Sequence, residues 1–449
     1  MINRTALTAL KAWKDSKNRH PLILRGARQV GKTTIIDEFG KSFDHYLYFN
    51  LEDVSDKALL EIDLPLDALI DLLYASRSAT KQGSTLIFID EIQNSPKTIT
   101  LLRFFYERCP DLHIVAAGSL LENIVDVKVS FPVGRVDFMP IRPCSFFEFM
   151  CAISKGQLLE AIKTPGYAAP FHNQLIHLFN QYCITGGMPE IVQEYVDTRD
   201  VLALDHIYSR LLRGYIDDVE KYAGTKKISE VVRFIINYGW PFAGATITLG
   251  NFSSSGYSAR EMGEAFRLLQ KAMLLELALP STSTQLPLIP EMRRMPKLLW
   301  FDTGLVNYMS KVRQEIIGSR DILDIWKGRI GEQVVAQELL TINDDINETR
   351  MFWTRGRGES GAEVDFLRIV DSTVIPIEVK AGHNSHLRSL HSFIDLSSDC
   401  RLAVRVWSGN YQVEDQLSSG MKKPFRLINI PFYMIWNLDN IVRQELSRL

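Results

Sequence analysis

The sequence predicts an α/β protein in which a parallel-sheet core is followed by a helical unit, a winged-helix-like unit and a second α/β unit. Three observations predict this order. Short buried strands alternate with helices over the first 120 residues, a phosphate-loop motif follows the first strand, and two charged strands near the C-terminus read "EVDFLRIVDSTVIPIEVK". Alternating strands and helices are typical of parallel sheets covered by helices on both faces.

Four apolar runs are the predicted strands of the core. Each ends in a polar residue or glycine, and they read PLILRG (21–26), YLYFNLED (46–53), TLIFIDE (85–91) and LHIVAAGS (112–119). Helical patterns separate the runs. One helix is predicted to begin at Ser95 and Pro96, an N-cap followed by a proline at the first helical position. The core is expected to span residues 1–142.

The middle of the chain is predicted to be mostly helical. Apolar spacing indicates an all-helical unit over residues 143–224. Residues 225–315 then contain two predicted helices, over 226–239 and 258–279, and a predicted hairpin over 287–305, the order of a winged-helix unit. Ser258 and Glu261 form a capping box that fixes the start of the second of these helices.

Basic residues of this unit and of the following loop are candidate phosphate contacts. They are Arg260, Arg267, Arg293, Arg294, Lys297, Arg355 and Arg357. A winged-helix unit also serves as a spacer between proteins, so both interpretations stay open.

Residues 316–449 are predicted to form the second α/β unit. A helix, "DILDIWKGRIGEQVVAQELL", precedes the charged strands, which are joined by a turn near Asp371 and Ser372. A helix, a strand "CRLAVRVWSG" and a closing helix follow. Pro376 removes a donor from the second charged strand, which predicts an edge position or a bulge there.

Composition excludes several classes of protein. Hydrophobic residues make up 46% and charged residues 23% of the 449 residues, and the net charge is −2, which does not fit a polycation that coats nucleic acid. Neither a membrane span nor a signal peptide is visible, so a cytoplasmic protein is expected. The five cysteines lack metal-ligand spacing and are expected to be reduced thiols.

The motif G-x-x-x-x-G-K-T predicts a nucleotide site for ATP and Mg²⁺. It follows a predicted strand and opens a helix, so backbone N–H groups of its loop can hold phosphates. Lys32 is expected to reach the β- and γ-phosphates and Thr33 to bind Mg²⁺. The expected binding residues are Gly26, Ala27, Arg28, Gln29, Val30, Gly31, Lys32, Thr33 and Thr34.

Acids at the end of a neighbouring strand complete this site. "TLIFIDEIQ" brings Asp90 to the carboxyl end of its strand, where it is expected to bind Mg²⁺, and Glu91 beside it is expected to activate water. Ser119 ends the next strand and either faces the γ-phosphate or is a plain strand terminus. Arg135 is either an arginine finger for a neighbouring subunit or a solvated loop residue.

The charged strands predict a metal-dependent site of the nuclease type. Asp365 and Glu378 are candidate metal ligands, and Lys380, two residues after Glu378, shares its face and is placed near the attacking water. Glu332 lies on the apolar stripe of its helix, so a metal or a lysine is expected as its partner. Glu363 replaces Asp365 if the register differs by two.

Taken together, the motifs resemble a known family. "LILRGARQVGKTT", "LIFIDEIQ", "GRVDFMPIRPCSFFEF" and "TGGMPEIV" are similar to prokaryotic AAA-type ATPases that carry a C-terminal domain of unknown function. The resemblance implies an AAA core and a helical lid in which Gly187 and Pro189 approach the nucleotide. It also implies a winged-helix unit and a C-terminal domain with the restriction-endonuclease-like PD-(D/E)xK fold.

These features predict an ATP-hydrolysing protein whose nucleotide state controls a nuclease-like domain that binds nucleic acid. Assembly into a ring or another oligomer is expected, and a membrane partner is not. The alternative is a nucleotide-gated switch or scaffold whose C-terminal domain does not cleave. Neither the substrate nor the subunit number follows from the sequence.

Overall fold

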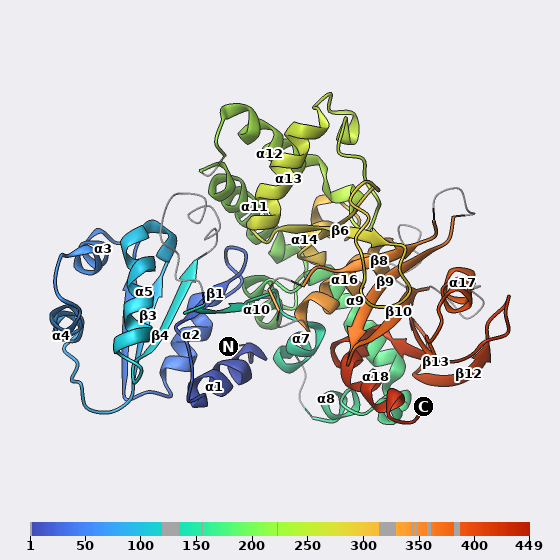
Figure 1. The fold of residues 1–449 in the computed structure, drawn as a ribbon, viewed down its shortest axis with the longest axis horizontal. Coiled ribbons are helices and arrows are strands. Elements are labelled where there is room, and N and C mark those ends of the chain that lie inside the picture. The colour runs from blue at the N-terminus through green and yellow to red at the C-terminus, as the bar shows by residue number, and fades with distance from the viewer. Residues whose placement is uncertain are drawn as a thin grey trace.

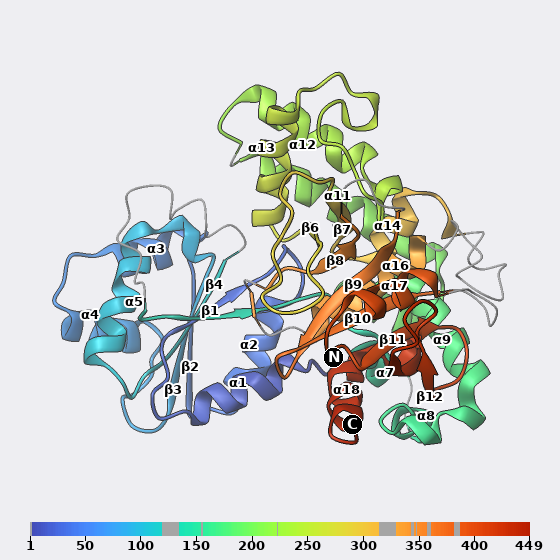
Figure 2. The ribbon, with the colours of Figure 1, turned by 45° about the vertical axis from the view of Figure 1, so that its right-hand side comes forward.

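A computed structural model describes residues 2–118, 134–153, 156–221, 223–313, 329–342, 345–346, 348–356, 361–380 and 387–449. The chain forms an N-terminal lobe and a larger second lobe, coloured blue to cyan and green to red in Figures 1 and 2. Each lobe is organised around its own sheet, and the described residues contribute five strands to the first sheet and eight to the second.

All pairings in the first sheet are parallel, in the order β2-β3-β4-β1-β5. Its strands are β1 (Leu22–Arg25), β2 (His45–Asn50), β3 (Thr85–Asp90), β4 (His113–Gly118) and β5 (Asp137–Pro140). The first four confirm the predicted strands. The fifth was not predicted, because its four residues alternate little in polarity and none of them is fully buried.

Helices cover both faces of this sheet, as expected. They are α1 (Ala6–Asp15), α2 (Lys32–Gly40), α3 (Val54–Glu61), α4 (Leu66–Ser76) and α5 (Pro96–Arg108). Leu24 and Phe88 pack with Phe39 of α2 on one face, and Ile89 packs with Leu73 of α4 on the other. Helix α5 begins where predicted, because the Ser95 side chain accepts a hydrogen bond from the N–H of Thr98.

Helices dominate the next part of the chain. They are α7 (Phe146–Ile153), α8 (Gln157–Ala161), α9 (His172–Thr185), α10 (Pro189–Thr198), α11 (Asp205–Glu220), α12 (Lys226–Tyr238) and α13 (Ala259–Lys271). Short 3₁₀ turns are η1 (Ile92–Asn94), η2 (Pro165–Tyr167), η3 (Ala169–Phe171), η4 (Leu202–Leu204), η5 (Trp240–Phe242), η6 (Phe252–Ser254) and η8 (Phe432–Asn437). The capping box of Ser258 and Glu261 starts α13 as predicted.

The predicted hairpin of residues 287–305 has only its second strand where expected. Residues 275–279, predicted to end the second helix, instead begin the first strand, and the hairpin is part of the second sheet. Strand β6 (Leu275–Ser281) pairs antiparallel with β7 (Lys297–Trp300) through residues 275–278 and parallel with β8 (Met351–Thr354) through residues 279–281. Helix α14 (Thr303–Met309) follows it. Since β6 is long enough to pair on both sides, the hairpin extends the C-terminal sheet.

The second sheet is mixed, in the order β12-β13-β11-β10-β9-β8-β6-β7. Its remaining elements are α16 (Arg329–Thr341), β9 (Glu363–Val370), β10 (Thr373–Val379), α17 (Arg388–Leu396), β11 (Leu402–Trp407), β12 (Gln412–Leu417), β13 (Pro424–Pro431) and α18 (Leu438–Leu446). Asp371 and Ser372 join β9 to β10 with φ of 46° and 63°, the left-handed values of a tight hairpin turn. The predicted turn is therefore confirmed.

The edge position predicted for Pro376 holds at that residue but not for its strand as a whole. Strand β10 is central, antiparallel to β9 and parallel to β11, and the β9 register runs regularly through Pro376 and Leu367. Pairing with β11 begins only at Ile377. The proline therefore precedes the ladder with β11, so its missing N–H interrupts no bond of that ladder.

Candidate functional site

The phosphate loop lies between β1 and α2 and is compact. Gly31 precedes α2 with φ of 90°, a left-handed value that favours glycine. A Cβ added to Gly26 would lie 2.3 Å from the carbonyl oxygen of Ile141, so only glycine fits there. The Nζ of Lys32 donates to the carbonyls of Gly26 and Ala27, both at 3.0 Å, and is directed onto the loop. Burial lowers the pKa of Lys32, an effect that Glu91 and Asp90 oppose.

Thr33 and Asp90 form the centre of the site. The Thr33 hydroxyl donates to Oδ2 of Asp90 at 2.7 Å, and the N–H of Glu91 donates to Oδ1 at 3.0 Å. Burial raises the pKa of Asp90. A hydroxyl and a carboxylate are hard oxygen ligands, which is the donor set that Mg²⁺ prefers, so these residues fit the ion that the motif implies.

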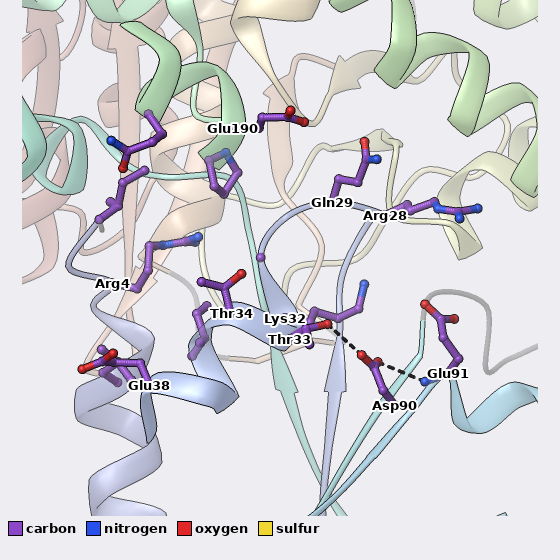
Figure 3. Close-up of a pocket in the computed structure, with 16 residues that line it drawn as sticks. Arg4, Arg28, Gln29, Lys32, Thr33, Thr34, Glu38, Asp90, Glu91 and Glu190 are labelled. Carbon is purple, nitrogen blue, oxygen red and sulfur yellow. Dashed lines mark hydrogen bonds between the residues drawn. The ribbon is translucent and has the colours of Figure 1, made fainter. Parts of the chain in front are cut away.

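Glu91 lies directly after β3 in a left-handed conformation with φ of 52°. Its carboxylate accepts a hydrogen bond from Gln93, and burial raises its pKa. Figure 3 shows the side chains of Lys32 and Glu91 extending to the same side of the Thr33–Asp90 pair. A partly buried carboxylate with a raised pKa is suited to accept a proton from water.

A cavity of about 540 Å³ adjoins the loop. This volume is that of small-ligand sites. Besides residues of the loop, of α2 and of the end of β3, the lining includes residues of the N-terminal segment and of α10: Ile2, Arg4, Leu7, Pro189, Glu190 and Gln193. The N-terminal residues were not predicted, because they stand well before the motif and carry no motif of their own.

The two candidate lid residues have different positions. Pro189 lines the cavity, whereas Gly187 is not among the lining residues. The N–H of Gly187 donates to Oδ2 of Asp302 at 2.6 Å, and its carbonyl accepts from the N–H of Cys144 at 2.6 Å. The phosphate loop also contacts the helical unit through Arg28, whose Nη1 lies 3.3 Å from Oδ1 of Asp218 on α11.

Two further candidates of the nucleotide site lie elsewhere. Ser119 falls outside the described residues. Arg135 is 37% exposed, and its Nε lies 2.8 Å from Oε1 of Glu107 on α5. Arg135 therefore lies at the surface of its own lobe.

The C-terminal candidates gather where β9 and β10 meet. The Nζ of Lys380 lies 2.9 Å from Oε1 of Glu378, as expected for two residues on one face. The N–H of Val379 donates to Oδ2 of Asp365 at 2.7 Å. Burial and the repulsion of Asp365 raise the pKa of Glu378 to about 8, against the attraction of Lys380. Oε2 of Glu378 is buried and has no hydrogen-bond partner among the described residues.

The partner of Glu332 is a lysine that was assigned a different role from the sequence. The Nζ of Lys297 lies 2.8 Å from Oε2 of Glu332, 2.9 Å from Oε1 of Glu363 and 4.0 Å from Oδ1 of Asp365. Its side chain is 1% exposed, so its predicted role as a phosphate contact on the wing is wrong. Burial lowers the pKa of Lys297, but the attraction of the three carboxylates raises this pKa by a larger amount. The pKa of Lys297 therefore lies above its usual value.

The acids around Lys297 have the spacing of a metal site. Glu332, Glu363 and Asp365 each offer an oxygen, and these atoms lie within 4.8 Å of one another. This group of described residues differs from the predicted set of ligands, because it includes Glu363 and not Glu378. Burial raises the pKa of Glu332 to about 7; the repulsion of Asp365 adds to this rise and Lys297 opposes it. Carboxylates at this spacing fit a hard divalent ion as well as an ammonium.

The parallel sheet, the compact loop and the Thr33–Asp90 pair define a nucleotide-binding core of the P-loop ATPase class. Residues 18–150 match the AAA domain, so the N-terminal lobe carries an AAA-type P-loop ATPase domain. Residues 176–316 and 327–431 match two domains of unknown function, DUF8612 and DUF4143. No curated protein matches the chain.

Solved structures resemble the chain at low identity. A Walker-type ATPase of Pyrococcus abyssi is 12% identical, with a TM-score of 0.41 over 69% of this chain and 96% of that one. The Orc1 protein of Aeropyrum pernix, solved in complex with DNA, is 13% identical, with a TM-score of 0.30 over 71% and 94%. Cdc6p of Pyrobaculum aerophilum is 14% identical, with a TM-score of 0.27 over 70% and 93%.

Within the described ranges, no helix is both long enough and apolar enough to cross a membrane.

Proposed function

We propose that the protein binds and hydrolyses ATP, and that the nucleotide state controls the C-terminal carboxylate–lysine centre, which acts on nucleic acid. The observation that carries the ATPase proposal is the 2.7 Å hydrogen bond between Thr33 and Asp90 beside Lys32. It joins the hydroxyl and the carboxylate that a Mg²⁺–ATP complex requires at neighbouring positions.

The residues of the nucleotide site have distinct roles in this proposal. Loop N–H groups and the ammonium of Lys32 bind the phosphates, and Thr33 and Asp90 hold Mg²⁺. When bound there, the ion would supply positive charge that neutralises the phosphate oxygens. Glu91 orients a water molecule and accepts its proton, for which its raised pKa is suited.

Control of the C-terminal centre begins at Arg4. Its Nη1 donates to the carbonyl of Val30 in the phosphate loop at 3.1 Å, and its Nη2 donates to the carbonyl of Arg142. Its Nε lies 3.2 Å from Oε2 of Glu148 on α7. Because Arg4 is 7% exposed and Glu148 is 3% exposed, a displacement of the loop is transmitted to α7.

The next contacts connect α7 to α16. The N–H of Phe146 donates to Oε1 of Glu338 at 3.0 Å, and the hydroxyl of Tyr182 donates to the same oxygen at 2.7 Å. Glu338 and Glu332 belong to the same helix, about 9 Å apart along its axis. A shift of α7 therefore moves the helix that carries Glu332, which supports control of the C-terminal centre by the nucleotide.

A groove beside the C-terminal centre supports nucleic acid as the partner. It has a volume of about 550 Å³, and its lining includes Arg293, Arg294, Arg355 and Glu363. The Nη1 of Arg294 donates to the carbonyl of Arg355 at 2.6 Å, which fixes its position in the groove. Arginine side chains bind phosphate oxygens in a fork geometry, and Glu363 places this groove next to the carboxylates.

Phosphodiester cleavage is the reaction proposed for this centre. Asp365 and Oε2 of Glu378 are the candidate ligands of a divalent ion, which would activate water and stabilise charge on the phosphate. This Oε2 is buried and accepts no hydrogen bond from any described residue. Lys380, 2.9 Å from Glu378, is placed to assist the attacking water. Hard carboxylate oxygens suit Mg²⁺ or Mn²⁺ in this role.

A nucleotide-gated scaffold is the second candidate function, and Lys297 favours it. Its ammonium already neutralises carboxylates that a two-ion nuclease centre would offer to metal. In this case the same contacts from Arg4 to α16 transmit the nucleotide state to a surface that binds a partner without cleaving it.

Self-association is part of the proposal. Arg135 is exposed and is accessible to a neighbouring copy. Mixing Arg135→Ala with Lys32→Ala tests this role, because an arginine supplied in trans restores part of the ATPase rate to the mixture. A wild-type rate for Arg135→Ala alone would exclude the arginine finger.

The ATPase rate with and without DNA or RNA tests the main proposal. We expect turnover that depends on Lys32, and stimulation by the nucleic acid on which the C-terminal centre acts. An unchanged rate in Lys32→Ala would exclude the ATPase assignment. Turnover that neither DNA nor RNA changes would favour the scaffold.

A further inference from the structure

The surroundings of Lys297 are built from three separate elements. Lys297 opens β7 and pairs with Ala278 of β6, Glu332 comes from α16, and Glu363 and Asp365 come from β9. Strand β7 and helix α16 are in contact, so folding brings the lysine and Glu332 together although they are far apart in the sequence.

Carboxylates and aromatic rings lie around the ammonium of Lys297. Two carboxylates lie within hydrogen-bond distance, at 2.8 and 2.9 Å, and a third lies at 4.0 Å. The Nζ lies 4.9 Å from the ring centroid of Phe352 and 5.6 Å from that of Phe366, distances at which an aromatic ring attracts a cation. These contacts make a site for one positive charge, closed to solvent by the 1% exposure of the lysine.

The same carboxylates satisfy the distance requirement of a divalent-ion site, since their oxygens lie within 4.8 Å of one another. An ammonium 2.8–2.9 Å from two of them takes the space that such an ion would need. Asp365 belongs to this cluster and also lies beside Glu378, whose Oε2 has no hydrogen-bond partner in the part of the chain that the structure describes. The centre therefore has two adjacent positions for a cation, one of them filled by the chain itself.

We infer that Lys297 is the resident cation of the Glu332–Glu363–Asp365 cluster, so that this position excludes divalent metal and the centre takes at most one ion, between Asp365 and Glu378. This inference deepens the proposed function, because it limits that centre to a single divalent ion. It also assigns Lys297, which belongs to the β6–β7 hairpin, a part in the centre.

Mn²⁺ binding to the full-length, nucleotide-free protein tests the inference. Isothermal titration and the electron paramagnetic resonance signal of free Mn²⁺ both measure stoichiometry without any cleavage. We expect Glu332→Gln to leave the wild-type stoichiometry and affinity unchanged, and Glu378→Gln to weaken binding outside the nucleotide site by tenfold or more. A tenfold loss of Mn²⁺ affinity in Glu332→Gln would overturn the inference.

Lys297→Met provides the second test. This variant should gain one Mn²⁺ site, and the double variant Lys297→Met/Glu332→Gln should lose it again. A folded Lys297→Met protein, judged by its circular dichroism and ATPase rate, that gains no site would overturn the inference. If Lys297→Met does not fold, the comparison of Mn²⁺ binding between the wild type and Glu332→Gln still tests the inference. Lack of ATPase or nuclease activity would contradict the proposed function and leave these binding results interpretable.

Discussion

Arg4 and Glu148 form an ion pair, Nε to Oε2 at 3.2 Å, in which both side chains are almost fully buried. Glu148 also accepts hydrogen bonds from the N–H of Thr5 at 2.6 Å and of Ser145 at 3.0 Å. The segment before α1 is thereby tied to α7, at the joint between the phosphate loop and the second lobe. Nucleotide binding and the position of α7 are therefore expected to depend on each other.

Arg4→Met should destabilise the protein by about 3 to 5 kcal/mol, because it leaves the carboxylate of Glu148 buried without its cation. Urea unfolding followed by circular dichroism measures this effect. The matched control is Arg233→Met, which removes an exposed ion pair with Glu220 and should cost at most about 1 kcal/mol. Equal losses in the two variants would contradict the buried role of Arg4.

Glu91→Gln should lower the ATPase turnover about 10²- to 10⁴-fold, because glutamine cannot accept the proton of the attacking water. ATP binding should persist, since Lys32 and Thr33 are unchanged, and a fluorescent nucleotide measures it. The control is Glu52→Gln, an exposed acid of the same lobe, which should turn over at the wild-type rate. Retained turnover in Glu91→Gln would remove Glu91 from the mechanism.

Glu338 should make stability fall as pH rises. Burial raises its pKa to about 7 from 4.5, so the folded state holds a proton that the unfolded state has already lost. The stabilisation of the folded state by this proton is fully present below pH 4.5 and is lost as pH rises through 7. The loss amounts to roughly 3 kcal/mol.

Glu338→Gln tests this pH dependence, because the amide oxygen can still accept from Phe146 and Tyr182 but does not ionise. The difference in unfolding free energy between variant and wild type should shift in favour of the variant between pH 5 and 8. Urea titrations at both pH values measure it. Parallel pH profiles for the two proteins would show that Glu338 does not titrate in this range.

Gly187→Ala and Gly214→Ala should have opposite effects. A Cβ on Gly187 would lie 2.2 Å from the carbonyl oxygen of Cys144, so this variant should lose about 1 to 3 kcal/mol. Gly214 is inside α11 and has no atom within 4 Å of such a Cβ, so alanine should stabilise that helix by about 0.5 to 1 kcal/mol. Thermal unfolding measures both. A stable Gly187→Ala variant would contradict the close packing of the two segments.

Asp365→Ala and Lys380→Ala should abolish any Mg²⁺- or Mn²⁺-dependent cleavage of DNA or RNA, because they remove a carboxylate proposed as a metal ligand and the ammonium beside Glu378. Gel assays on single- and double-stranded substrates measure this. Asp371→Ala, in the exposed turn between the same strands, is the control and should cleave as the wild type does. Cleavage that survives both test substitutions would place the nuclease activity elsewhere.

Local rules predicted much of the fold. Short apolar runs located β1 to β4, a side-chain cap fixed the start of α5, and a capping box fixed α13, because each depends on residues close together in the chain. The loop motif likewise predicted a compact phosphate loop with Thr33 and Asp90 available to each other. The β9–β10 turn and the Lys380–Glu378 pair were predictable from strand periodicity.

The features that were not predicted depend on contacts between residues that are distant in the sequence. Strand β5 forms because β1 offers an open edge, and Pro376 is tolerated in a central strand because the ladder with β11 starts after it. The burial of Glu332 predicted a metal or a lysine as its partner, but only the fold identified Lys297.

The sequence by itself determined the parallel core, the phosphate loop with its acids, and the charged strands, since these are written in short-range patterns. Tertiary structure decided that Arg4 lines the nucleotide cavity, that the β6–β7 hairpin extends the second sheet, and that Lys297 fills the acidic cluster. The hairpin joins the sheet through backbone pairing of β6 with β8. The positions of Arg4 and Lys297 arise from burial, which costs free energy for every charge left unpaired and therefore brings together charges from distant parts of the chain.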